Sequence, residues 1–90
     1  GEVPAPRYPS LGQLRSIEAE VFFVVGRDDH VTPYRLGMML GDFIPRYEVL
    51  VPIDNHSLTL QKDIYPELRR AFFLHGLESP ELSEVKERIE

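Results

Sequence analysis

Cysteine is absent from the 90-residue chain. Its absence excludes disulfide bonds, thiolate metal sites and a cysteine nucleophile, but it leaves the cellular compartment open, because many secreted proteins also lack cysteine. The chain also lacks an excess of basic residues: ten lysines and arginines stand against fifteen aspartates and glutamates, a formal net charge of −5. Since no basic stripe could neutralise phosphates, nucleic acid is not expected as a partner.

Long hydrophobic runs are missing as well. The longest apolar stretch, residues 21–25, is far shorter than the roughly 20 residues that a membrane span needs. The N-terminus also lacks the basic-then-apolar pattern of a signal peptide. We therefore expect a soluble chain without a membrane span, with any targeting segment outside these 90 residues.

The composition that remains is that of one small globular domain, with 42% hydrophobic and 28% charged residues. A chain of this length buries a smaller fraction of its surface than a full enzyme domain does. A large enclosed active site built by this chain alone is therefore not expected.

Two apolar segments are predicted to form strands. Residues 21–25 are β-branched or aromatic and end at Gly26, and residues 48–53 form a second such run. Because residues 21–25 are apolar on both faces, they predict a buried parallel strand. Two strands do not make a stable parallel sheet in water, since their edges need partners and their faces need cover. We therefore predict an α/β fold that is the end of a larger sheet.

Helices are predicted around these strands. Thr32 and Pro33 fit the cap and first position of a crossover helix. Its apolar face is predicted to consist of Leu36, Met39, Leu40 and Phe43. We expect a single domain with three parts. Residues 1–20 are an extended lead-in with a short helical turn after Ser10, and residues 21–76 are a βαβα unit. Residues 77–90 form a weakly apolar helix that is expected to be peripheral.

Polar residues cluster directly after both predicted strands. They are Arg27, Asp28, Asp29 and His30 after the first strand, and Asp54, Asn55 and His56 after the second. In open α/β sheets the carboxyl ends of neighbouring parallel strands meet at one edge, where functional residues lie. A carboxylate on one loop can fix the tautomer of an imidazole on the other and stabilise its cationic form. The pattern predicts an orienting acid and a general base.

Residues 21–76 resemble the C-terminal part of an α/β-hydrolase. The likeness rests on the first strand, Gly-Arg-Asp-Asp at 26–29, Val-Thr-Pro at 31–33, Ile-Pro at 44–45, the second strand, His56 and a closing helix that reaches two phenylalanines at 72–73. In that family the triad acid stands three residues after the strand-ending glycine, which implies Asp29, and the late histidine implies His56. The segment from residue 71 to 76, with Pro80, is similar to the tails of tripeptidyl- and prolyl-aminopeptidase-like members. Asn55 stands where family members usually have glycine.

The nucleophile of such an enzyme is not in this chain. A serine hydrolase needs a serine on a sharp strand-to-helix turn, usually within Gly-x-Ser-x-Gly, and backbone donors for the oxyanion. None of the five serines (10, 16, 57, 79 and 83) is flanked by glycines at that spacing. The resemblance therefore implies a C-terminal fragment of a serine hydrolase, inactive alone, that acts on ester, amide or peptide bonds and has its serine on a missing segment or partner chain.

The same residues allow other interpretations. Acyltransferases of the homoserine-acetylating type share the late acid and histidine, and a non-enzymatic module could use the bare sheet edge for assembly. Asp29 could cap the following helix, and His56 could be a loop histidine bonded to the backbone. A metal site from Asp28, Asp29, His30, Asp54 and His56 has no supporting spacing, so neither a metal nor a cofactor is expected.

Overall fold

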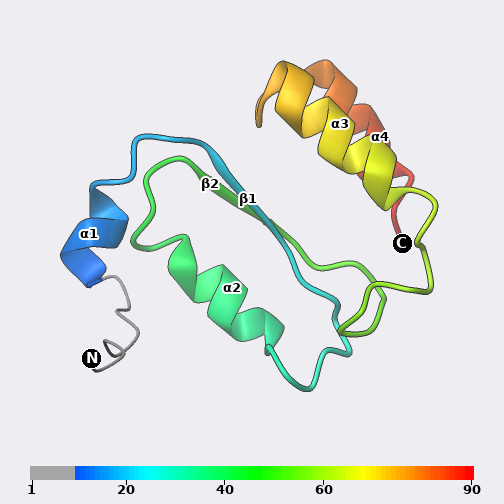
Figure 1. Cartoon of the computed structure of the whole chain (residues 1–90), viewed down its shortest axis with the longest axis horizontal. Helices are drawn as coiled ribbons and strands as arrows, with labels where there is room; N and C mark the ends of the chain where they lie inside the picture. Colours follow the sequence, from blue (N-terminus) through cyan, green and yellow to red (C-terminus); the bar gives the residue numbers. More distant parts are fainter. Residues whose placement is uncertain (1–9) are drawn as a thin grey trace, which may run out of the picture.

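The structure, a computed structural model, describes residues 10–90. Its elements are α1 (Leu11–Arg15), β1 (Val21–Val24), α2 (Tyr34–Leu40), β2 (Tyr47–Leu50), α3 (Tyr65–His75) and α4 (Pro80–Glu87) (Figure 1). The predicted order of strands and helices is confirmed. The helical turn after Ser10 is α1, and the Ser10 hydroxyl accepts a hydrogen bond from the Gln13 amide at its start. The extended lead-in predicted for the first residues falls on residues 1–9, outside the described part of the chain.

The two strands form a parallel sheet, as predicted. Val21 lies opposite Tyr47, and Val24 lies opposite Leu50. Within residues 10–90 no other strand joins this sheet, and every residue of β1 is only half-buried. The prediction of a buried strand is therefore wrong for Val21–Val24, and of the predicted run only Val25 is buried. In the described part of the chain nothing pairs with the outer edge of β1.

Helices cover both faces of the sheet (Figure 1). Because side chains alternate along a strand, neighbouring residues of β1 face opposite layers. Phe22 and Val24 pack toward α3 and α4, whereas Phe23 faces α2 at Gly37. A Cβ at Gly37 would lie 2.9 Å from the Phe23 ring, so glycine allows α2 to lie close on the sheet. The described part of the chain is thus a three-layer α/β/α unit.

The core lies between α3 and α4. Its buried members are Leu68, Ala71, Leu82 and Val85. Leu82 is completely inaccessible to solvent, which makes α4 part of this core and not the peripheral helix predicted for residues 77–90. The sequence pattern did not predict this burial because the apolar stripe of α4 is thin. Its Leu82 and Val85 nevertheless pack against Leu68 and Ala71 of α3.

The crossover helix also begins differently from its prediction. Thr32 provides no side-chain cap, and Pro33 is the N-cap residue and not the first helical residue. Of the predicted apolar face, Leu36 and Met39 remain exposed, and so does Met38. The buried position of α2 is Gly37, which lies against the Phe23 and Val49 side chains of the sheet.

Candidate functional site: an Asp29 and His56 pair at the strand ends

The two polar loops lie side by side beyond the carboxyl ends of β1 and β2. Backbone hydrogen bonds continue the contact of the strands into the loops: the Arg27 amide donates to the Pro52 carbonyl oxygen at 2.8 Å, and the Asp28 amide donates to the Asp54 carbonyl oxygen at 2.9 Å. The predicted meeting of the loops is confirmed.

Gly26 makes this close approach possible. A Cβ at this position would lie 2.6 Å from the Asp54 carbonyl oxygen and would also overlap the Asn55 carbonyl oxygen. Both atoms belong to the backbone, so a side chain could be accommodated only if the two loops moved apart. The strand-ending glycine therefore sets the distance between the acid-bearing and the histidine-bearing loop.

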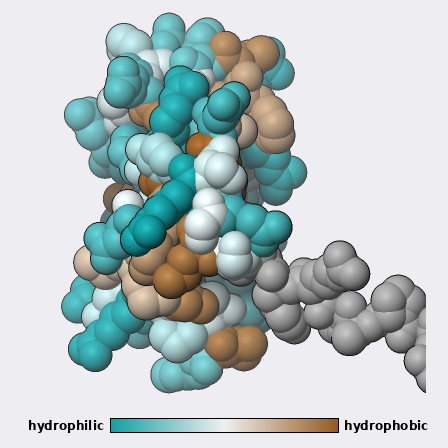
Figure 2. Space-filling view, turned by 90° about the vertical axis from the view of Figure 1, so that its left-hand side faces the viewer, coloured by the Kyte–Doolittle hydropathy of each residue, from teal (hydrophilic) through white to brown (hydrophobic). Residues whose placement is uncertain are grey.

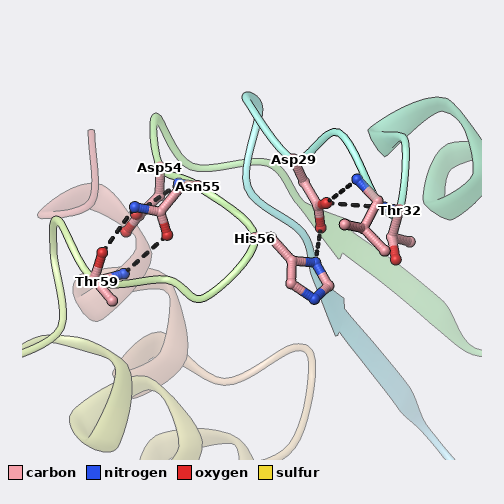
Figure 3. Close-up of polar contacts among 7 residues, drawn as sticks. Asp29, Thr32, Asp54, Asn55, His56 and Thr59 are labelled. Carbon is pink, nitrogen blue, oxygen red and sulfur yellow. Dashed lines mark hydrogen bonds and ion pairs between the residues drawn. The ribbon is translucent and has the colours of Figure 1, made fainter.

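Asp29 is a buried carboxylate, with 4% of its side chain exposed. Its Oδ1 accepts hydrogen bonds from the Val31 and Thr32 amides, both at 2.8 Å. This arrangement orders the turn that leads into α2 and leaves Oδ2 directed at His56 (Figure 3). The alternative that Asp29 caps the following helix is wrong, because α2 has Pro33 as its N-cap and no side-chain cap. The Val31 and Thr32 amides that Asp29 holds precede the helix, and its other oxygen contacts His56.

His56 completes the pair from the second loop. Its Nδ1 lies 2.8 Å from Asp29 Oδ2. Because an ionised carboxylate can only accept, Nδ1 carries the proton of this bond. In the neutral imidazole the lone pair is then on Nε2, and this nitrogen points away from Asp29 (Figure 3). With 53% of its side chain exposed, His56 presents a proton acceptor to solvent.

The surroundings of Asp29 keep it ionised. Burial raises the pKa of its carboxyl, but hydrogen bonds from the Thr32 amide, from His56 and from the Val31 amide outweigh burial and hold the pKa below the ordinary value of 3.8. A carboxylate that stays ionised beside Nδ1 stabilises the imidazolium form that proton transfer to Nε2 would produce.

The turn that carries His56 is ordered by its own polar groups. The side chain of Asn55 donates from Nδ2 to Thr59 Oγ1 at 2.7 Å and accepts the Thr59 backbone amide at Oδ1 at 3.4 Å (Figure 3). The backbone carbonyl oxygen of Asn55 accepts from the Leu58 amide at 3.2 Å. Leu58 has a φ of 53°, a left-handed conformation that is uncommon for a residue other than glycine. The asparagine in the place where the resemblance implies glycine thus closes the turn.

Asp54 is an important residue of this region that the sequence did not single out. Its side chain is completely buried and accepts hydrogen bonds from three backbone amides and one hydroxyl. The sequence identified it only as a polar residue after the second strand and as one of five possible metal ligands. Three of its four donors are backbone groups, which a sequence pattern does not reveal.

The other candidate residues do not join the pair. Asp28, His30 and His75 are exposed. Among residues 10–90 no three histidine, aspartate or glutamate side chains gather in a way that could hold a metal ion. The five residues considered for a metal site are therefore not brought together as a ligand set.

Three serine hydroxyls in the described part of the chain serve local structure. Ser10 caps α1, Ser16 Oγ donates to the Gln13 carbonyl oxygen, and Ser79 Oγ accepts from the Leu82 amide at the start of α4. Within residues 10–90, none of the hydrogen bonds made by a serine side chain involves His56.

An apolar groove of about 480 Å³ opens between β1 and α3. Its walls are Phe22, Val24, Leu58, Tyr65, Leu68, Arg69, Phe72 and Phe73. Leu58 joins this groove to the turn that carries His56. On another face, Figure 2 shows apolar side chains gathered in the lower half of the molecule. Of the side chains of α2, Leu36, Met38 and Met39 are exposed.

Comparisons with protein-family models, curated proteins and solved structures gave no match for this chain. None of the helices in residues 10–90 is long and apolar enough to cross a membrane. The chemistry of the site is therefore inferred from its own geometry.

Proposed function

We propose that this chain supplies the acid and the base of a serine hydrolase with an α/β-hydrolase fold, acting on an ester, amide or peptide substrate. The observation that carries the proposal is the 2.8 Å bond between Asp29 Oδ2 and His56 Nδ1. A buried carboxylate, an exposed imidazole and their position at the carboxyl ends of parallel strands are the properties that such a pair requires.

The chemistry follows from the two ring nitrogens. His56 Nε2 takes the proton of a serine hydroxyl as the serine oxygen attacks the substrate carbonyl carbon, and the same nitrogen then gives the proton to the leaving group. Asp29 stays ionised, keeps the proton on Nδ1 before the reaction and stabilises the imidazolium during it. Hydrolysis of the acyl-enzyme repeats these steps with water as the nucleophile.

The serine is proposed to lie on a segment that pairs with the open edge of β1. Among residues 10–90 no strand occupies that edge, and the apolar groove beside it is lined by Phe22 and Val24 of β1 itself. An unpaired strand edge next to an apolar surface is a site for a further strand and its cover. The same segment would supply the oxyanion donors, and the 90 residues alone are expected to be inactive.

A non-enzymatic assembly module is the second candidate, and the same open edge of β1 favours it. In that case Asp29 and His56 serve only to hold the loops, and their replacement leaves function intact. An acyltransferase of the same fold would use the identical pair, since transfer to an alcohol or to water needs the same base.

The test isolates the native assembly that contains this chain and treats it with a fluorophosphonate, which forms a covalent bond with an activated serine. Mass spectrometry then locates the modified residue. We expect one modified serine outside residues 1–90, and we expect His56→Ala and Asp29→Asn to lower its reaction rate, the latter by about 10⁴-fold, as for other orienting carboxylates.

Matched controls separate chemistry from general disturbance. Asp28→Asn removes the exposed carboxylate next to Asp29, and His75→Ala removes an exposed histidine at the end of α3. Both are expected to leave labelling unchanged. An assembly without any labelled serine, or labelling that survives His56→Ala, would contradict the hydrolase proposal and favour the assembly module.

A further inference from the structure

Asp54 is a buried carboxylate that the proposed chemistry does not use. It lies two residues before His56, and none of its side chain is exposed. Its four donors are the Asn55 amide (2.7 Å) and the Leu60 amide (3.0 Å) on Oδ1, and the Gln61 amide (3.2 Å) and the Tyr65 hydroxyl (2.6 Å) on Oδ2. Burying a charge is costly unless it is hydrogen-bonded, and here both oxygens are fully engaged.

These bonds close the turn on which His56 stands. The Asn55 amide comes just before His56, whereas the Leu60 and Gln61 amides come from the far end of the turn. One carboxylate therefore holds both ends, and the Tyr65 hydroxyl fixes that carboxylate to the first turn of α3. The imidazole projects from a loop whose width is set by Asp54.

Asp54 also contacts the loop of the acid. Its backbone carbonyl oxygen accepts the Asp28 amide at 2.9 Å, one residue before Asp29. The backbone of Asp54 thus bonds to the residue before Asp29, and its side chain bonds to the residue before His56. Asp54 makes no hydrogen bond to the side chains of Asp29 or His56 themselves.

We propose that Asp54 is a positioning residue for His56: its buried carboxylate holds the turn of residues 55–60 so that Nδ1 stays within hydrogen-bond distance of Asp29. The inference rests on the proposed function, because orienting His56 has a purpose only if its Nε2 receives a proton. Charge-assisted bonds to backbone amides suit this task, since they are shorter and stronger than bonds to a neutral acceptor.

The ionisation of Asp54 is secured by its neighbours. Burial raises its pKa, but the hydrogen bonds from the Tyr65 hydroxyl and from the Leu60, Asn55 and Gln61 amides bring the pKa below the ordinary 3.8. Tyr65 in turn has a raised pKa, because of its burial and its bond to Asp54. The hydroxyl therefore remains a donor, and the carboxylate an acceptor, at neutral pH.

The experiment measures the tautomer of His56 in the 90-residue chain by long-range proton–nitrogen NMR correlation from the ring C–H protons. The wild-type chain is expected to show the Nδ1–H tautomer. Asp54→Asn keeps the size of the side chain but removes its charge, so we expect loss of the Nδ1–H signature and a shift toward Nε2–H. Asp63→Asn, the same change at an exposed position of the same segment, should alter nothing.

Tyr65→Phe keeps the test decisive if Asp54→Asn does not fold. It removes one of four donors and is expected to weaken the Nδ1–H signature in part. If Asp54→Asn folds and the tautomer of His56 is unchanged, the positioning role is overturned. If only Tyr65→Phe folds, an unchanged tautomer in that variant overturns it. Neither result affects the pair of Asp29 and His56. Failure of serine labelling together with the expected tautomer shift would instead reject the hydrolase and keep the coupling of Asp54 to His56.

Discussion

Asp29 and Asp54 are two buried aspartates in adjacent loops, and their different partners give them different tasks. Asp29 bonds to two amides with one oxygen and to a half-exposed imidazole with the other, so one face of the bonded group remains open to a reactant. Asp54 bonds only to backbone amides and a hydroxyl, and all of it is enclosed. The distribution of partners therefore separates a carboxylate suited to chemistry from one suited to structure.

The lowered pKa values of both aspartates predict how stability depends on pH. In the folded chain each carboxyl has a pKa below its ordinary 3.8, so the unfolded chain takes up protons first as the pH falls. The stabilisation by these groups is complete above about pH 4 and is lost progressively below it, down to the folded pKa values.

Urea unfolding followed by circular dichroism between pH 6 and pH 2 measures this loss. We expect the free energy of unfolding to fall less steeply below pH 4 in Asp54→Asn than in the wild-type chain, because one of the two groups no longer titrates. Equal slopes would show that the bonds to Asp54 do not favour its ionised form.

At the scale of the elements, the site depends on how closely the two strand ends approach, and Gly26 permits that approach. Gly26→Ala would place a Cβ against two backbone carbonyl oxygens. We expect a loss of about 1–3 kcal/mol in the free energy of unfolding, the range for overpacked positions, together with loss of the Asp29 and His56 hydrogen bond. Guanidinium unfolding and the His56 tautomer signal measure the two effects.

Gly12→Ala is the matched control for this substitution. A Cβ there would have its nearest neighbour at 3.9 Å on the exposed helix α1. Because alanine is the better residue in a helix, the variant should be as stable as the wild-type chain or up to about 1 kcal/mol more stable. If both variants behaved alike, the close approach at Gly26 would not limit the geometry of the pair.

The elements also show how far a sequence can be interpreted. The order of strands and helices and the meeting of Asp29 with His56 were predictable, because polar residues directly follow two apolar runs and parallel strands end at one edge. The burial of α4 was not, since it depends on the packing of its thin stripe on α3. The role of Asp54 was not predictable either, because backbone amides of residues that fold back to it are its main partners.

The exposed face of α2 limits prediction for a different reason. Helical spacing identified Leu36 and Met39 as apolar neighbours on one face of the helix. The spacing does not predict which surface, if any, packs against that face. In residues 10–90 the sheet meets α2 at Gly37, and both longer side chains stay accessible. Their burial would need a surface beyond the described part of the chain.

For the molecule as a whole, the edge of β1 that no strand of residues 10–90 occupies is where the proposed further segment would pair. The Val21 amide donates to the carbonyl oxygen of Arg46, just before β2, and the Val25 amide donates to that of Leu50, the last residue of β2. Because donors alternate along a parallel strand, the amides of Phe22 and Val24 point to the opposite, open edge. Within residues 10–90 no strand pairs with these two amides of β1, so we expect them to exchange with solvent.

Hydrogen exchange followed by NMR on the isotopically labelled chain tests whether this edge receives the strand that we propose. In the isolated chain we expect the Phe22 and Val24 amides to exchange faster than that of Val25. In the native assembly we expect both to slow by at least tenfold, the effect of about 1.4 kcal/mol of added protection. The Val49 amide, which by the same alternation faces the other edge of the sheet, provides the internal comparison. If Val49 alone became protected, the added segment would pair with β2, and the serine would have to reach His56 from the opposite side of the sheet.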